Sequence, residues 1–326
     1  MEVEKVKISK KLRLAQLRRI YELLNRDPRI TITDISKELG ITQPTIRNRM
    51  NEAIDKGYMS MPKIRKKSFS NFKEYVYFVR CKDPLELYLQ YSKDQRIIYH
   101  AVMGGFTNLW VISKEEIDID GDILISGPRS DYHVPFAPNH TWKTGIKNIE
   151  EMTERFEPNK YEPKGVLQTH WDETIEWDAI DEILYRYFKY DLRKPLTPLK
   201  REYLITTRKY KDWFKKLPEY CTVYLRYFPK GISSYDSYIF VFETDYDDFI
   251  IDLFSQLPTS STFFKVSNKL ILYAFVERGS IRDGDIQPIS DVSELHIPFL
   301  VKNLSRKGIV RNAEHTILSY HWGKRI

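Results

Sequence analysis

The stretch Ile32–Tyr58, ITDISKELGITQPTIRNRMNEAIDKGY, decides the fold of the N-terminal part of the chain. Its pattern predicts a short helix, a tight turn at Gly40 and a longer helix that follows Thr42, a preferred N-cap residue. Pro44 would lie in the first turn, where its missing N–H breaks no hydrogen bond. Two helices joined by such a turn form a helix–turn–helix motif.

The two faces of these helices differ in chemistry. The apolar residues recur at helical spacing and predict an inner face of Ile35, Leu39, Ile41, Ile46, Met50 and Ile54. The outer face carries amide, hydroxyl and guanidinium groups, which read base edges in a major groove. We expect base contacts from Thr42, Gln43, Thr45, Arg47, Asn48, Arg49 and Asn51. The alternative is a solvated bundle helix, whose outer face would favour Glu and Lys.

A basic run, Lys63-Ile64-Arg65-Lys66-Lys67, follows at the position of a wing or linker. Such a run neutralises phosphates without reading sequence. We expect phosphate contacts from Lys37, Lys63, Arg65, Lys66 and Lys67. A solvated linker is the alternative for the run.

Composition and charge agree with a polyanionic partner. The 326 residues carry a net charge of +7, which leans toward double-stranded DNA. Two distant cysteines form no ligand cluster, and we expect no metal, cofactor or catalytic residue. The charged start of the chain and the lack of an apolar run of about 18 residues predict a cytoplasmic protein without a membrane partner.

From Lys73 the period of the pattern changes to that of strands. Strands are expected at 75–80, 96–102, 109–113 and 166–171, and helices at 84–92 and 145–156. This order is β-α-β-β-α-β, the ferredoxin-like plan. Residues 117–142 interrupt it as a long, turn-rich insertion.

The pattern then starts again. Helices are expected at 177–190, 197–204 and 206–217, strands at 222–228, 237–243, 263–266, 270–276 and 316–322, and further helices at 245–257 and 292–307. Residues 21–42 align without gaps onto 185–206 with seven identities in 22 positions. Asp-Gly-Asp-Ile recurs at 120–123 and 283–286, and His-Trp at 170–171 and 321–322. Internal duplication explains these repeats best.

The predicted fold is therefore α+β, with two winged or helix–turn–helix three-helix units, each followed by a ferredoxin-like βαββαβ domain. The boundaries are expected at 1–62, 63–172 with an insertion at 115–144, 173–218 and 219–326. The two heads are not equal, because Trp213 makes the second more aromatic and Asp212 would face phosphate unfavourably. Its basic residues offer a second DNA contact through Arg208, Lys209, Lys211 and Lys215. Alternatively, this head is degenerate and packs against a neighbour.

A helix–turn–helix followed by a βαββαβ domain resembles the Lrp/AsnC family of feast/famine transcriptional regulators. ELGITQPTIRNRMNEAIDKGY looks like the recognition region of that family, and KEYVYFVRC with 103–113 looks like its sheet domain. Gly105-Phe106-Thr107-Asn108 stands where the family usually has Gly-aromatic-Asp. The resemblance implies a DNA-binding regulator with a small-molecule effector. It also implies a homodimer, or a pseudo-dimer within one chain.

Two other functions stay open. Siroheme decarboxylases resemble Lrp/AsnC proteins in architecture. If this chain were such an enzyme, Arg129, His133 and His140 would hold the anionic tetrapyrrole. These residues lie in GPRSDYHVPFAPNHTW, which builds either a pocket or cap, or a surface loop pinned by prolines. An architectural protein would bind any duplex at similar strength. We interpret the His-Trp pairs as structural and the Asp-Gly-Asp segments as turns, since two carboxylates are too few for a calcium loop.

Overall fold

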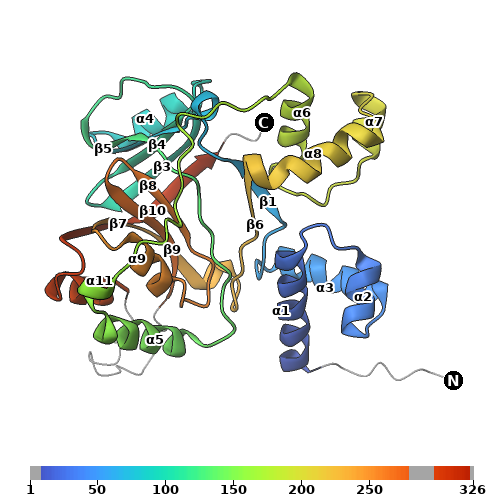
Figure 1. Ribbon diagram of the computed structural model, residues 1–326, viewed down its shortest axis with the longest axis horizontal. Helices are drawn as coiled ribbons and strands as arrows, with labels where there is room; N and C mark the ends of the chain where they lie inside the picture. The colour runs from blue at the N-terminus through green and yellow to red at the C-terminus, as the bar shows by residue number, and fades with distance from the viewer. Residues whose placement is uncertain (1–8, 279–296, 324–326) are drawn as a thin grey trace.

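The chain forms two lobes, one helical and one built around a sheet (Figure 1). The structure is a computed structural model that describes residues 9–278 and 297–323. Residues 1–8, at the charged start of the chain, and the second Asp-Gly-Asp-Ile segment, at 283–286, lie outside the described residues.

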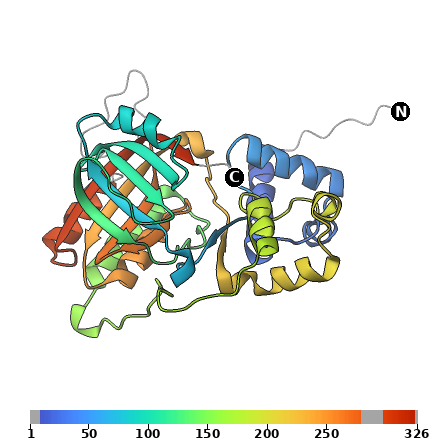
Figure 2. The same cartoon turned by 90° about the horizontal axis from the view of Figure 1, so that it is seen from above.

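The helical lobe holds both predicted heads side by side (Figure 2). Its helices are α1 (Lys10–Arg26), α2 (Ile32–Leu39), α3 (Gln43–Asp55), α6 (Ala179–Phe188), α7 (Thr197–Glu202) and α8 (Thr207–Tyr220). The turn between α2 and α3 occurs at Gly40, whose φ of 64° lies in the left-handed region that favours glycine. Ile35, Ile46 and Met50 are buried as predicted, but Ile54 is 37% exposed and does not belong to the core.

Two arginines join the heads in a reciprocal manner. The Arg29 guanidinium donates to the carbonyl of Leu192, and Arg193 donates to the carbonyls of Pro28, at 3.2 Å, and Ile30, at 2.6 Å. Arg29 and Arg193 occupy aligned positions of the sequence repeat. The contact therefore has the self-complementary form of a two-fold interface.

A two-stranded ribbon links the lobes (Figure 1). Strand β1 (Lys63–Lys66) follows the first head, and β6 (Cys221–Tyr224) follows the second. They pair antiparallel, with Lys63 opposite Tyr224 and Lys66 opposite Cys221.

The second lobe is built on one antiparallel sheet of eight strands, in the order β5-β2-β4-β3-β10-β7-β9-β8. Their bounds are β2 (Tyr75–Arg80), β3 (Ile97–Gly105), β4 (Leu109–Ser113), β5 (Asp122–Pro128), β7 (Tyr235–Glu243), β8 (Thr262–Val266), β9 (Lys269–Glu277) and β10 (Asn312–Gly323). The two edges meet where Arg129 bridges Val266 and the Ser130 amide donates to the Lys265 carbonyl at 2.9 Å. The sheet thereby curls into a nearly closed barrel (Figure 2).

Apolar side chains fill the inside of the barrel, and helices cover its outside. Phe78, Trp110, Phe264 and Ile271 belong to one interior cluster although they come from both halves of the chain. The covering helices are α4 (Pro84–Tyr91), α5 (Trp142–Arg155), α9 (Asp247–Phe254) and α11 (Ile297–Arg306). Short 3-10 turns occur at Ser70–Phe72, Pro158–Lys160 and Ile232–Ser234.

The second half follows the predicted β-α-β-β-α-β order, but the first half does not. The expected strand at 166–171 is absent, and only His170 forms a single bridge, to Phe69. Strand β5, from the predicted insertion, takes the place beside β2 instead, so no free edge is left there. Helix α5 likewise packs into the core of the second half, where Ile146 and Ile149 join the cluster of α9.

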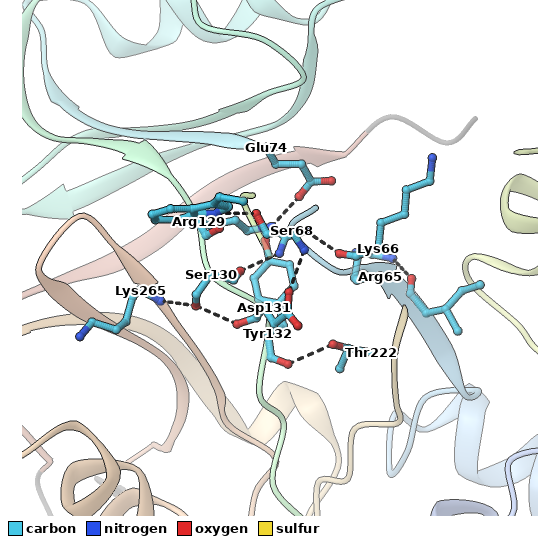
Figure 3. A network of polar contacts seen from close by, with 12 residues as sticks. Arg65, Lys66, Ser68, Glu74, Arg129, Ser130, Asp131, Tyr132, Thr222 and Lys265 are labelled. Carbon is cyan, nitrogen blue, oxygen red and sulfur yellow. Dashed lines mark hydrogen bonds and ion pairs between the residues drawn. The ribbon is translucent and has the colours of Figure 1, made fainter. Parts of the chain in front are cut away.

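Arg129 is the centre of a buried polar network where the barrel closes (Figure 3). Its Nε donates to Glu74 Oε2 at 2.7 Å. Its two terminal nitrogens donate to the carbonyls of Ser130 and Lys66, each at 2.8 Å, and the guanidinium lies 4.1 Å from the centre of the Tyr132 ring. Burial raises the pKa of Glu74, but Arg129 outweighs this effect and holds the pKa below its usual value.

We predict that Arg129→Met destabilises the protein by on the order of 3–5 kcal/mol, because it leaves the largely buried Glu74 carboxylate without its partner. Urea denaturation at neutral pH measures the loss. The matched control is the double variant Arg129→Met/Glu74→Met, which should recover part of the stability because no charge is then stranded. A single variant as stable as the wild type would show that the pair does not hold the barrel closed.

Candidate nucleic-acid interface

The outer face of α3 presents an open row of polar side chains. Gln43, Arg47, Asn48 and Asn51 are exposed. Within the described chain, Arg47, Asn48 and Asn51 have no polar partner. Gln43 donates to Thr33 Oγ1 at 3.2 Å, which fixes it against α2. This face is therefore free to contact a duplex.

The N-terminal end of α3 is less open. Thr42 is exposed, but Thr45 is half-buried. Their hydroxyls lie 2.9 Å apart and form a hydrogen bond. Both residues lie at the N-terminal end of the predicted base-contacting face. Thr42 is the residue before the first helical residue of α3.

Arg49, a predicted base contact, faces α1 instead. Its Nε donates to Gln16 Oε1 at 2.9 Å, and its guanidinium lies 3.6 Å from Glu52. Glu52 also pairs with Arg13 and Lys56. These contacts anchor α3 on α1 and surround the Glu52 carboxylate with cations. Residues 43–51 themselves contain no acidic side chain.

The basic run after α3 is not the solvated linker that the sequence offered as the alternative to phosphate contacts, because residues 63–66 form strand β1. Lys63, Arg65, Lys66 and Lys67 are only half-exposed. Lys66 Nζ lies 2.6 Å from Glu182 Oε2 and within 4.8 Å of the ring centres of three aromatic residues, which are Phe72, Trp177 and Tyr185. Lys63 and Arg65 line an internal cavity. Of the predicted phosphate contacts, Lys37 is the one on the open surface, with its side chain 75% exposed.

The second head keeps a basic surface but has a different recognition helix. Arg208, Lys211 and Lys215 are exposed along α8. Lys209 is held by Asp178, at 2.8 Å, and by Asp181, at 3.0 Å. Trp213 is buried in the core of the head and stacks on Phe188, so its aromatic character serves packing.

The residues proposed for tetrapyrrole chemistry do not converge. Arg129 is held in the polar network, whereas His133 packs near Phe263, where burial lowers its pKa. His140 Nε2 forms a hydrogen bond of 2.6 Å with the Gln256 carbonyl. The predicted surface-loop alternative is wrong for residues 129–131, which are buried. The neighbouring Tyr132 and Val134 line the cavity, as a pocket or cap would.

The first His-Trp pair, at 170–171, makes contacts that serve the packing of the fold. His170 stacks on Phe69 and lies between Asp131 and Glu173, while Trp171 Nε1 donates to Ser68 Oγ at 3.0 Å. The side chains of the second His-Trp pair, 321–322, lie outside the described residues. The described residues contain no cluster of metal-binding side chains. None of the described helices has the length and apolar character needed to cross a bilayer.

Comparison with known proteins supports the assignment of the first head. Residues 13–58 match a family of winged helix-turn-helix DNA-binding domains. No curated protein matches the chain. Two crystal structures of the siroheme decarboxylase NirDL are similar to this chain. The first is 9% identical with a TM-score of 0.48. The second, a co-complex with an iron-uroporphyrin III analogue, is 10% identical with a TM-score of 0.46. Each alignment covers 95% of this chain and 92% of the other. The chain thus contains an N-terminal winged helix–turn–helix DNA-binding domain.

We predict that Lys66→Met lowers stability at neutral pH by on the order of 1–3 kcal/mol, because it removes a charged hydrogen bond and its aromatic contacts. Burial raises the pKa of Glu182, but hydrogen bonds from Lys66 and Arg186 outweigh it and lower the pKa to about 2. The contribution is therefore present above the unfolded pKa, about 4.5, and is lost as the pH falls toward about 2.

Urea denaturation at pH 7 and pH 3 tests this account of Lys66. The difference between wild type and variant should shrink at pH 3. An equal difference at both pH values would show that Lys66 acts through packing on the three rings and not through Glu182.

Proposed function

We propose that this protein is a sequence-specific DNA-binding regulator of the Lrp/AsnC type, in which α3 reads the major groove. The observation that carries the proposal is the exposed row of Arg47, Asn48 and Asn51, which have no polar partner among the described residues. This row lies within the segment that matches winged helix–turn–helix DNA-binding domains. The expected partner is double-stranded DNA.

The chemistry of this row fits base recognition. Arg pairs with guanine through two hydrogen bonds, and Asn does the same with adenine. The helix is already fixed by Arg49 and Gln16 on its inner side, so binding does not have to order the backbone. The proposed contact extends to the N-terminal end of α3, where Thr42, Gln43 and Thr45 lie.

The arrangement of the two heads supports a pseudo-dimer within one chain. The reciprocal contacts of Arg29 and Arg193, together with the antiparallel ribbon of β1 and β6, have the form of a two-fold interface. We infer an internal duplication in which the second head adds phosphate contacts through Arg208, Lys211 and Lys215. Such contacts position a protein on the duplex without reading sequence.

The enzymatic alternative lacks a supporting arrangement. Arg129, His133 and His140 make separate contacts, so no group of acid and base is assembled from them. The architectural alternative predicts equal binding to all duplexes and is distinguished by the experiment below.

We predict that Arg47→Ala weakens binding to a selected target sequence by on the order of 1–3 kcal/mol, because it removes a contact to a base edge. Binding to a scrambled duplex should change much less. Fluorescence anisotropy at several salt concentrations measures both quantities.

Two matched controls separate base contacts from phosphate contacts. Lys37→Ala should weaken binding to both duplexes and lower the salt slope by about one, while Lys66→Met should leave the slope unchanged because its ammonium is held by Glu182. If Arg47→Ala affects target and scrambled duplex equally, α3 does not read sequence and the architectural alternative holds.

A further inference from the structure

A cavity of about 220 Å³ lies at the mouth of the barrel, facing the helical lobe. Barrel strands supply its inner wall, including Tyr99, Trp110 and Tyr273. The ribbon between the lobes supplies Lys63, Arg65 and Tyr224. The cavity therefore lies apart from the outer face of α3. Mouths of barrels are common places for ligand sites.

Four cations line this cavity, namely Lys63, Arg65, Lys189 and Arg226. In the described part of the chain, none of them forms an ion pair. Among the described residues that line the cavity, Glu74 is the one carboxylate, and Arg129 already binds it. Charges taken out of bulk water are costly unless they are paired. The surplus of positive charge requires a negative partner that the described residues do not supply.

Two neighbouring groups respond to this positive charge. Burial and the charge of Arg65 lower the pKa of Lys189 to about 8. Burial raises the pKa of the Tyr224 phenol, but Arg65, Arg226 and Lys63 outweigh it and bring the pKa below its usual value. Both shifts have the direction expected of a site that favours negative charge.

The walls between the cations are aromatic. The Trp110 ring lies 4.7 Å from Tyr99 and 6.2 Å from Tyr273, measured between ring centres. The Arg226 guanidinium lies 5.0 Å from the centre of the Tyr273 ring. Its Nη2 is 3.5 Å from the Thr262 hydroxyl, while its Nε is buried without an acceptor in the described residues. The Arg226 side chain thus keeps hydrogen-bonding capacity next to an aromatic surface.

We propose that the cavity binds a small organic anion with an aromatic ring, whose acidic groups contact Lys63, Arg65 and Arg226. The aromatic body would pack against Tyr99, Trp110 and Tyr273. A volume of about 220 Å³ is below the range of roughly 300–1,000 Å³ typical of drug-sized ligands. The occupant is therefore a compact metabolite, with either carboxylate or phosphate as its acidic group.

Isothermal titration calorimetry on the full chain tests the site with defined probes. Benzoate, isophthalate and phenyl phosphate supply a ring with different acidic groups. Isophthalamide supplies the ring without charge, and inorganic phosphate supplies charge without the ring. We expect at least one aromatic anion to bind at least about tenfold more tightly than both isophthalamide and inorganic phosphate, because charge and ring act together. The best probe distinguishes a carboxylate from a phosphate ligand.

Two variants locate the binding. Arg226→Met and Lys63→Met should each weaken the best probe by at least about tenfold, since each removes a charged contact. Lys114→Met is the matched control, because it removes one exposed lysine outside the cavity and should leave the affinity unchanged. Thermal unfolding without the probe checks that each variant folds.

Three results would overturn the proposal. One is that no aromatic anion binds better than isophthalamide. Another is that inorganic phosphate binds as well as the aromatic anions, which indicates an unspecific anion site. The third is that affinity survives in a folded Arg226→Met or Lys63→Met variant, which places the binding elsewhere.

Discussion

The Arg129 guanidinium connects the parts of the molecule that must be held together. It donates to the carboxylate of Glu74 immediately before β2, to the carbonyl of Lys66 at the end of β1, and to the carbonyl of its own neighbour Ser130. The same segment bridges the two edges of the sheet. One buried cation therefore closes the barrel and ties the ribbon that follows the first head to it. A guanidinium suits this role because its fixed fork of donors can serve several acceptors at once.

Positive charge is used in two separate ways. On the outer face of α3, Arg47 is exposed, has no partner within residues 9–278 and 297–323, and is available to a large polyanion. In the cavity, Lys63 and Arg65 are partly buried among aromatic side chains, which suits a small anion. Strand β1, which carries both of these residues, begins eight positions after the end of α3. The ribbon therefore joins the proposed ligand site directly to the DNA-binding domain.

Local features were predictable from the sequence, and pairings between distant segments were not. The glycine turn at Gly40 and the strands near 75–80 and 109–113 follow from residue conformation and alternation. In contrast, Lys66 pairs with Glu182, which lies 116 residues away in the sequence. The residues around Lys66 therefore do not indicate that it is partly buried. The expected strand at 166–171 failed because β5 filled the place beside β2. The cavity left one signal in the sequence, a charged Arg226 within an otherwise apolar and aromatic run.

Selection from a pool of random duplexes tests whether α3 reads DNA sequence. The purified protein is mixed with the pool at moderate salt, the bound DNA is recovered and sequenced, and the rounds are repeated. We expect one motif to become enriched, because α3 distinguishes bases through the groups on its outer face. Recovery of the same sequence composition as the starting pool, with DNA nonetheless bound, would contradict it.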